Sequence, residues 1–268
     1  MLDIPINFSE LSRLYEDHFE IVRANTPALL DRVYEIRYQV YCVENAFEDP
    51  AQNVGGREMD GDDDRAAHIL LIHRKTGEAA GTARVIFPDP SQRRPLPVED
   101  VLDPVGERLF ARLPRESTGE ISRFAVPKAF RRRRGEERYP DIGPTTPPGA
   151  SSSGVPEQRI MPFITFGLLR GIVGICLKSG ISHITAVMEP PLIRLLGRFG
   201  LDFEPIGGLV DYHGLRQPCV ARLDDLIDRV REESGCLWLY AKEEVLRHST
   251  PTLKATVGVA PRTDGKRI

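Results

Sequence analysis

The stretch GEISRFAVPKAFRRRRGEER, residues 119–138, joins a strand pattern to a cluster of arginines. Its first part, residues 119–126, alternates in the manner of a β-strand and is followed directly by Pro127. From Arg123 to Arg138 seven basic residues stand against two acidic ones, a local balance of +5. This cluster either lies in solvent or binds a negatively charged partner, for which a nucleic acid, a cofactor phosphate and an acidic protein are the candidates.

The composition of the whole chain narrows these candidates. The chain has 268 residues, enough for one sizeable core, and a formal net charge of −3. The arginine cluster is therefore a local feature of a mildly acidic protein, whereas nucleic-acid binders are usually basic over a whole domain. We expect no nucleic-acid partner.

The sequence shows no sign of a membrane span or of export. No apolar run reaches the ~18 residues of a transmembrane helix, and residues 1–20 lack the basic start and apolar centre of a signal peptide. The four cysteines are scattered and form no Cys-x-x-Cys pair, so neither a disulfide framework nor a zinc site is expected. We expect no transmembrane segment, no metal and a cytoplasmic location.

Helix and strand patterns alternate along the chain. Apolar spacing and turn residues predict helices at about 27–40, 95–113, 161–180, 190–200 and 224–234. Strands are predicted at 66–73, 81–87, 119–126, 181–188, 201–207 and 215–223. Strands that first follow one another and then alternate with helices predict an α/β fold, in which helices flank one mixed central sheet.

Three segments are predicted to be loops or tails. Residues 42–65 are polar and acidic and are expected to form an ordered loop or a lid. Residues from about 136 to 159 are rich in Pro, Gly and Ser and are expected to be a flexible insert. With a disordered tail at 251–268, the chain is predicted to be a single domain over residues 1–250.

Four separated clusters hold residues suited to chemistry. In chain order these are Arg37, Tyr41 and Phe47; Glu58, Asp60 and Asp63; Arg84; and Glu120, Arg123 and Phe124. Their pattern, Arg-x3-aromatic-x5-aromatic, Glu-x-Asp-x2-Asp, Gly-x2-Arg and Glu-x-Ser-Arg-Phe, resembles that of the acyl-homoserine lactone (autoinducer) synthases over about residues 30–130. Residues 186–221 are similar to the GNAT-type acyltransferases associated with PEP-CTERM/exosortase systems and, less closely, to the N-acyl amino acid synthases.

This resemblance implies a GNAT-like (acyl-CoA N-acyltransferase) fold and an N-acyltransferase activity. A fatty acyl group would pass from acyl carrier protein (ACP) or CoA, as acyl-ACP or acyl-CoA co-substrate, to the amine of a small acceptor such as an amino acid. No tightly bound cofactor is expected.

Three departures from the autoinducer synthases concern the product. Phe47 stands where those enzymes typically carry tryptophan, Gly61 and Asp62 replace a commoner aromatic-containing pair, and the Pro/Gly/Ser insert is atypical. We therefore expect an N-acyl amide as the product. A lactone made from S-adenosylmethionine is the alternative product, and a non-enzymatic polyanion-binding module is the rival class.

The reaction itself indicates roles for these residues. An amine attacks only when it is neutral, so a carboxylate must take its proton directly or through water, and Glu120 is the candidate base. Partial burial is expected to raise the pKa of Glu120 toward neutrality. Asp60 and Asp63 suit a cationic acceptor, and they equally suit salt bridges that hold their loop to an arginine. Arg37 or Arg84 suits an acceptor carboxylate.

Arg123 is predicted to be catalytic together with Glu120, although residues three apart on a strand point to opposite faces. Only a β-bulge brings both into one cleft, and the resemblance implies a bulge on this strand. Tyr41, Phe47 and Phe124 are predicted to shape the acceptor and acyl pockets, although Phe124 suits the core better. Glu58 completes the predicted substrate-binding set.

The arginine cluster is predicted to bind the acyl carrier. In GNAT enzymes, the turn after this strand carries Arg/Gln-x2-Gly-x-Gly/Ala, whose backbone N–H groups hold the CoA pyrophosphate. Arg132 and Gly135 fit this pattern, but Glu137 stands where a small residue is needed and would repel a pyrophosphate. We therefore predict docking of the acidic face of ACP by four arginines. They are Arg131, Arg132, Arg133 and Arg134.

Overall fold

A computed structural model of the chain describes residues 17–91, 93–131, 160–197, 200–212 and 214–233. Its frame is a mixed sheet with the strand order β1-β2-β3-β4-β5-β8-β6, and β7 pairs with β8 off this path. The strands are β1 Phe19–Ala24, β2 Ala66–His73, β3 Ala79–Ile86, β4 Thr118–Ala125, β5 His183–Met188, β6 Glu204–Pro205, β7 Val210–Asp211 and β8 Leu215–Arg222. Neighbouring strands are antiparallel except for β4 and β5, which are parallel. The predicted α/β fold with a mixed central sheet is confirmed.

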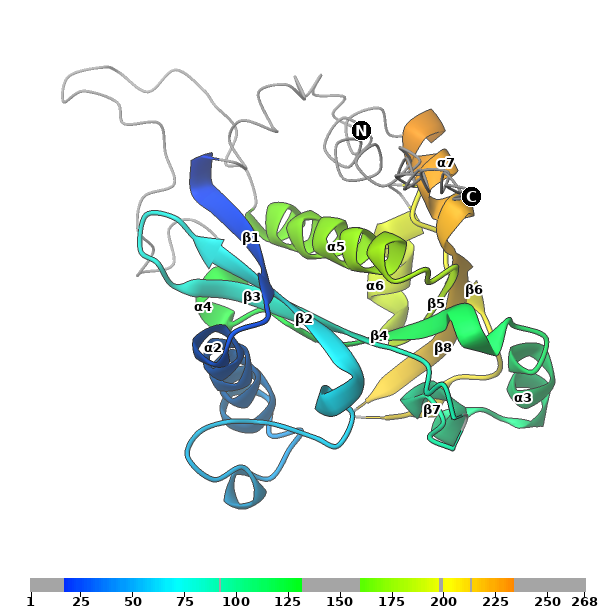
Figure 1. Cartoon of the computed structure of the whole chain (residues 1–268), viewed down its shortest axis with the longest axis horizontal. Coiled ribbons are helices and arrows are strands. Elements are labelled where there is room, and N and C mark those ends of the chain that lie inside the picture. The colour runs from blue at the N-terminus through cyan, green and yellow to red at the C-terminus, as the bar shows by residue number, and fades with distance from the viewer. Residues whose placement is uncertain (1–16, 92, 132–159, 198–199, 213, 234–268) are drawn as a thin grey trace, which may run out of the picture.

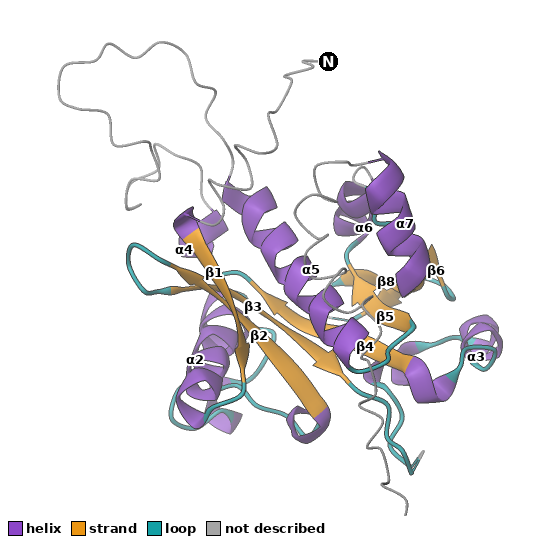
Figure 2. Cartoon of the chain, turned by 45° about the horizontal axis from the view of Figure 1, so that its top comes forward, coloured by secondary structure: helices purple, strands orange, loops and turns teal. Residues whose placement is uncertain are grey.

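Helices cover both faces of this sheet (Figures 1 and 2). They are α2 Pro27–Tyr38, α3 Pro104–Phe110, α4 Lys128–Arg131, α5 Ile160–Lys178, α6 Pro190–Gly197 and α7 Leu223–Glu233. A π-helical turn, Gln39–Glu44, continues α2, and short 3-10 turns lie at Pro50–Gln52, Asp63–Arg65, Pro97–Val101 and Arg115–Ser117. The apolar helix α5 packs on one face of β1, β2 and β3, and α2 lies on the opposite face.

The alternation of side chains along β2 builds a core layer on each face of the sheet. Ile69 and Leu71 pack against α5, whereas His68 and Leu70 point toward α2. Both faces of the strand are covered, which explains its nearly continuous apolar sequence. On the α5 side the packing depends on Gly171, where an added Cβ would lie 2.8 Å from Cγ2 of Ile69.

Most predicted elements are confirmed, and the exceptions are short. Thr26 caps α2, because its side-chain oxygen accepts a hydrogen bond from the Leu29 N–H at 3.4 Å. The structure also contains β1, β7 and α4, which the sequence did not predict. The last two span only two and four residues, and β1 is an edge strand with polar residues at its surface. The predicted insert and tail fall in ranges outside the described residues, and the single-domain organisation stays a prediction.

Candidate active site

A β-bulge in β4 rearranges the Glu-x-Ser-Arg-Phe sequence. Thr82 pairs with Ala125 and Arg84 pairs with Ser122, so β4 carries one residue more than β3 between these pairs. Arg123 accommodates the extra length with φ of +50°, a left-handed conformation that costs a non-glycine residue about 1–2 kcal/mol. Strained residues of this kind concentrate at functional sites. The bulge that the resemblance implied is present.

Strands β4 and β5 separate beside the bulge. Their parallel pairing runs from Thr118 and His183 to Ile121 and Ala186. Beyond these pairs β4 continues along β3, and β5 continues along β8. The hydrogen-bonded ladder therefore opens between the bulge and the end of β5 at Met188.

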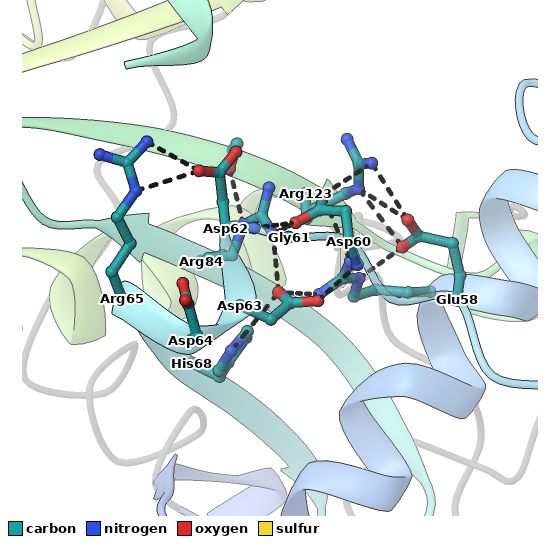
Figure 3. A network of polar contacts seen from close by, with 12 residues as sticks. Glu58, Asp60, Gly61, Asp62, Asp63, Asp64, Arg65, His68, Arg84 and Arg123 are labelled. Carbon is teal, nitrogen blue, oxygen red and sulfur yellow. Dashed lines mark hydrogen bonds and ion pairs between the residues drawn. The ribbon is translucent and has the colours of Figure 1, made fainter. Parts of the chain in front are cut away.

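Three arginines and three carboxylates form an ion-pair network on the α2 side of the bulge (Figure 3). Glu58 bridges Arg37 and Arg123 at N–O distances of 2.5 and 3.0 Å. Asp63 bridges Arg37 and Arg84 at 2.7 and 2.6 Å. These contacts join α2, the acidic loop and two strands.

Asp60 closes the network into a ring. Its carboxylate lies 2.5 Å from Nη1 of Arg84 and 2.9 Å from Nη2 of Arg123, and Figure 3 shows it between the two. Each of the three carboxylates thus bridges at least two arginines, and Asp60 also lies 3.8 Å from Nη2 of Arg37. The side chain of Asp60 is 27% exposed, whereas that of Asp63 is 6% exposed, so Asp60 forms the solvent-facing edge of the ring.

The arginines keep Asp60 and Asp63 ionised. Burial alone would raise the pKa values of Asp60 and Asp63, but the hydrogen bonds and charges of the neighbouring arginines bring both below their ordinary values. His68 lies 3.7 Å from Asp63, and burial lowers the pKa of this histidine to about 4, so its ring is neutral at pH 7. The salt-bridge role that the sequence left open is the one observed, and acceptor binding by Asp60 or Asp63 stays a prediction.

Glu120 is buried in different surroundings. Its side chain is 3% exposed, and Oε2 accepts a hydrogen bond from the backbone N–H of Val98 at 2.8 Å. Val98 and Ile86, which pairs with Glu120 across the sheet, both belong to an apolar cluster. Burial raises the pKa of Glu120 to about 8, and the hydrogen bond from Val98 only partly opposes this. A pKa raised in this direction suits a group that exchanges protons near neutrality.

The π-helical turn places two aromatic rings beside the network. The carbonyl of Tyr41 accepts hydrogen bonds from the N–H groups of Phe47 and Glu48 at 2.7 and 3.1 Å. The ring centroids of Tyr41 and Phe47 are 6.2 Å apart, and the guanidinium carbon of Arg123 lies 5.3 Å from the Tyr41 ring. Turns of the π type often occur at functional sites.

Phe124 contacts Tyr41 through its backbone carbonyl. Its carbonyl accepts a hydrogen bond from the Tyr41 hydroxyl at 3.4 Å, and its side chain packs against the core cluster that includes α5. The observed position of the side chain is thus the core position that the sequence favoured, with Tyr41 and Phe47 left beside the network.

The described part of the arginine cluster contacts the π-helical turn. Arg131 ends α4, and its Nη2 lies 2.8 Å from the carboxylate of Glu44. The same carboxylate accepts hydrogen bonds from the backbone N–H of Lys128 at 2.9 and 3.0 Å. Arg132, Arg133 and Arg134 lie outside the described residues, and ACP docking by the cluster stays a prediction.

Three residues that the sequence did not predict contact the site. Ser122 accepts a hydrogen bond from Nε of Arg84 at 2.9 Å, and Glu48 lies 3.3 Å from Arg123. The guanidinium carbon of Arg216 lies 5.9 Å from the centre of the Phe47 ring. Ser122 stands inside the Glu-x-Ser-Arg-Phe pattern, which was an available signal, whereas nothing in their local sequence distinguishes Glu48 and Arg216 from other charged residues.

A separate surface cleft of about 340 Å³ lies beyond Glu120 along β4. Its lining mixes charges of both signs, and Arg115 and Glu99 within it form an ion pair at 2.7 Å. None of the predicted site residues lines it.

Among the described residues, no group of three or more His, Cys, Asp or Glu side chains is arranged to hold a metal. No described helix has both the length and the apolar character needed to cross a membrane.

Residues 36–139 match the family model described as "Acetyltransferase (GNAT) domain". The AHL synthase LasI superposes with a TM-score of 0.50 at 17% identity, over 75% of this chain and 87% of that one. TofI, in a ternary complex with an inhibitor and MTA, superposes with a TM-score of 0.53 at 19% identity, over 80% of this chain and 96% of that one. FeeM, an N-acyl amino acid synthase from uncultured soil microbes, superposes with a TM-score of 0.51 at 15% identity, over 81% of this chain and 97% of that one.

No curated protein matches the chain significantly in sequence. The solved structures show that the chain has the GNAT fold, which confirms the expected fold and its likeness to the autoinducer synthases.

Proposed function

We propose that this GNAT-fold chain is an N-acyltransferase, which moves a fatty acyl group from an acyl-ACP or acyl-CoA thioester to the amine of a small acceptor such as an amino acid. The observation that supports this most strongly is Glu120, a buried carboxyl with a pKa raised to about 8, on the strand whose bulge carries Arg123. A proton acceptor of that strength is what the acylation of an amine requires. The GNAT domain match and the fold of the named acyltransferases agree with it.

Glu120 starts the reaction as the general base. Its carboxylate takes a proton from the acceptor's ammonium group, directly or through water, and leaves a neutral amine. The amine nitrogen attacks the thioester carbonyl, so that a C–N bond forms and the carbonyl oxygen becomes an oxyanion. The intermediate then collapses: the C–S bond breaks, the thiolate leaves with a proton from the new amide nitrogen, and Glu120 returns its own proton to water.

The opening between β4 and β5 offers the place for the oxyanion. Backbone groups of β4 beyond Ile121, on the side toward β5, are not used in the ladder between these two strands. A backbone N–H there can donate to the oxyanion at no cost in reorganisation, because the sheet already fixes its direction. We assign this role to the β4 backbone between Ser122 and Val126.

The ion-pair network supplies the fixed wall of the acceptor site. Arg37, Arg84 and Glu58 are buried and hold the acidic loop against the sheet. Asp60 and Arg123, at the exposed edge of the ring, are the members that we assign to contact with the acceptor. Tyr41 and Phe47 complete the wall with apolar surface.

The alternative product is an acyl-homoserine lactone made with S-adenosylmethionine as the acceptor. Asp60 and Glu48 both pair with Arg123, whose guanidinium lies over the ring of Tyr41. Carboxylates together with aromatic rings suit a sulfonium cation. We prefer the N-acyl amide because Phe47 replaces the tryptophan of the autoinducer synthases. A polyanion-binding module remains the rival from another class.

Three finer points belong to the same proposal. We assign ACP docking to Arg131, Arg132, Arg133 and Arg134, and a cytoplasmic location to the enzyme. Because residues 186–221 are similar to the acyltransferases of PEP-CTERM/exosortase systems, we also associate the enzyme with such a system.

The test is release of free thiol from dodecanoyl and hexadecanoyl thioesters of ACP and CoA, in the presence of an amine mixture and of S-adenosylmethionine. Mass spectrometry of the products then separates N-acyl amides from lactones. Amide formation supports the proposal, and lactones alone would replace it with the alternative. No thiol release, together with tight and salt-sensitive binding to DNA or RNA, would favour the rival class.

A further inference from the structure

The hairpin of β7 and β8 delivers an arginine to the acceptor site. Val210 of β7 pairs with Arg216 of β8, and Nε of Arg216 donates to the carbonyl of Tyr212 at 2.7 Å. This hydrogen bond fixes the direction of the side chain. The segment belongs to the sequence DYHGLRQPC, residues 211–219, which the reaction described above does not use.

Arg216 and Arg123 each lie close to one ring of an aromatic pair. The guanidinium carbon of Arg216 lies 5.9 Å from the Phe47 ring centre, and that of Arg123 lies 5.3 Å from the Tyr41 ring centre. The two rings are 6.2 Å apart, and the charge of Arg216 also acts on the Tyr41 phenol. Arg216 therefore borders the region that the acceptor is proposed to occupy, although it comes from the far end of the chain.

The inner arginines are not suited to a substrate carboxylate. Arg37 and Arg84 are 0% and 1% exposed, and each binds two carboxylates of the chain at 2.7 Å or less. A substrate carboxylate would have to enter this buried network and leave an acid such as Asp63 without its partner, which is costly in a desolvated site. The acceptor carboxylate that the sequence assigned to Arg37 or Arg84 thus needs another arginine.

Arg216 pairs with a carboxylate of a different kind. Nη1 of Arg216 lies 3.2 Å from Glu189, whose side chain is 57% exposed. An ion pair with so exposed a member contributes little, because water screens it. Glu189 directly follows β5, at the place where β4 and β5 have separated. A substrate carboxylate that forms two charge-assisted hydrogen bonds can replace Glu189 at this guanidinium.

We propose that Arg216 binds the carboxylate of the acceptor, which makes the acceptor an amine that also carries a carboxylate, such as a free amino acid. This inference rests on the proposed N-acyltransferase function. The ammonium group of the acceptor then lies toward Asp60 and Glu48, its carboxylate lies toward Arg216, and the rings of Tyr41 and Phe47 cover it.

The experiment measures thiol release by the full chain with dodecanoyl-CoA and two matched acceptor sets: the common amino acids and their α-carboxamides, which lack the carboxylate. Arg216→Gln removes the charge but keeps a hydrogen-bond donor for Tyr212, and Arg216→Lys keeps the charge without the bidentate fork. Arg222→Gln, an exposed arginine on the same strand, is the matched control. Glu189→Gln removes the competing carboxylate.

We expect the wild type to prefer amino acids to their carboxamides, and Arg216→Gln to raise KM for the amino acids by about tenfold or more. The same variant should change KM for the carboxamides less than twofold, with Arg216→Lys intermediate for the amino acids and Arg222→Gln unchanged. Glu189→Gln should lower KM for the amino acids, because the carboxylate of Glu189 then no longer competes for Arg216. If Arg216 and Glu189 only support folding, the variants Arg216→Gln and Glu189→Gln should both lose activity, and the loss should be the same for amino acids and carboxamides.

Three outcomes would overturn the inference while the proposed function stands. The first is that the wild type uses amino acids and carboxamides equally well. The second is that Arg216→Gln loses activity equally with both acceptor sets. The third is that the loss of activity in Arg216→Gln disappears when dodecanoyl-N-acetylcysteamine is the acyl donor. The last result would place a phosphate of the donor at Arg216, because this donor has none. Absence of thiol release by the wild type with every acceptor and donor would contradict the proposed function itself.

Discussion

The network carboxylates and Glu120, near one face of the sheet, have opposite electrostatic properties. In the network, Asp60 and Asp63 have pKa values below the ordinary range in spite of burial, because arginines surround them. Glu120, on β4, accepts a hydrogen bond from a backbone N–H, and burial raises its pKa to about 8. Burial is common to both groups, so the neighbouring charges decide which group is a permanent ion and which exchanges a proton. The network is suited to holding structure and Glu120 to chemistry.

The largest effect is expected from Glu120→Gln. If Glu120 is the general base, this variant lowers kcat/KM by about 10²–10⁴-fold, and the wild-type kcat/KM rises with pH to a plateau above about 8. The control is Glu107→Gln, an exposed glutamate of α3. A Glu120→Gln enzyme with full thiol release and an unchanged pH profile would remove this residue from the mechanism.

The same variant has a second signature in stability. The folded-state pKa of Glu120, about 8, lies above its ordinary value of 4.5, so the folded state holds more protons between these pH values. The wild type therefore loses stability as pH rises from about 4.5 to about 8. Glu120→Gln removes this loss, and its melting temperature relative to wild type should be higher at pH 9 than at pH 5.

Removing an arginine from the network tests its structural role. Arg37→Met leaves Glu58 and Asp63 buried without one of their partners, and we expect a loss of about 3–5 kcal/mol in the free energy of unfolding. For a domain of this size that corresponds to roughly 10 °C in melting temperature. The matched control is Arg57→Met, whose ion pair with Asp31 is about half exposed and should change stability by less than about 1 kcal/mol. Equal stabilities of the two variants would show that the network does not hold the fold.

Asp60→Asn should lower stability less than Arg37→Met does, and it should raise KM for the acceptor. Asp60 lies at the exposed edge of the ring, so we expect KM for the acceptor to rise about tenfold, with a smaller fall in melting temperature than in Arg37→Met. Because the folded-state pKa of Asp60 lies below its ordinary value of 3.8, its stabilising contribution is present above that value and is lost as pH falls further. Thermal melts between pH 6 and pH 2 should therefore show a smaller acid-induced loss in Asp60→Asn than in wild type.

The smallest effect is expected at the arginine cluster. Arg131→Ala should raise KM for acyl-ACP a few-fold, and replacement of Arg131 to Arg134 together should raise it more, because complementary charges speed carrier docking. Small acyl thioesters should be used as before, and Arg112→Ala, an exposed arginine, is the control. Since Arg131 also pairs with Glu44, an equal loss with both donors would indicate that the cluster instead supports the π-helical turn.

The four clusters were visible in the sequence, but the sequence left open which side chains would pair. The four sequence clusters do converge, because Arg37, Arg84 and Arg123 bind the same three carboxylates. Whether those carboxylates face one another or an open pocket depends on side-chain geometry, which spacing along a chain does not contain. The extra residue in β4 was expected only through resemblance, since a bulge depends on how two strands pair.

The sequence by itself determined the mixed α/β architecture, the positions of its longer helices and strands, and the residue types of the four clusters. These features follow from periodicity and capping, which are local along the chain. Only the tertiary structure decided that Asp63 is held by arginines, that Glu120 is left with a backbone N–H, and that Arg216 meets Phe47. Each of these depends on contacts between segments far apart in sequence, and the local dielectric and neighbouring charges that set a pKa exist only after the chain has folded.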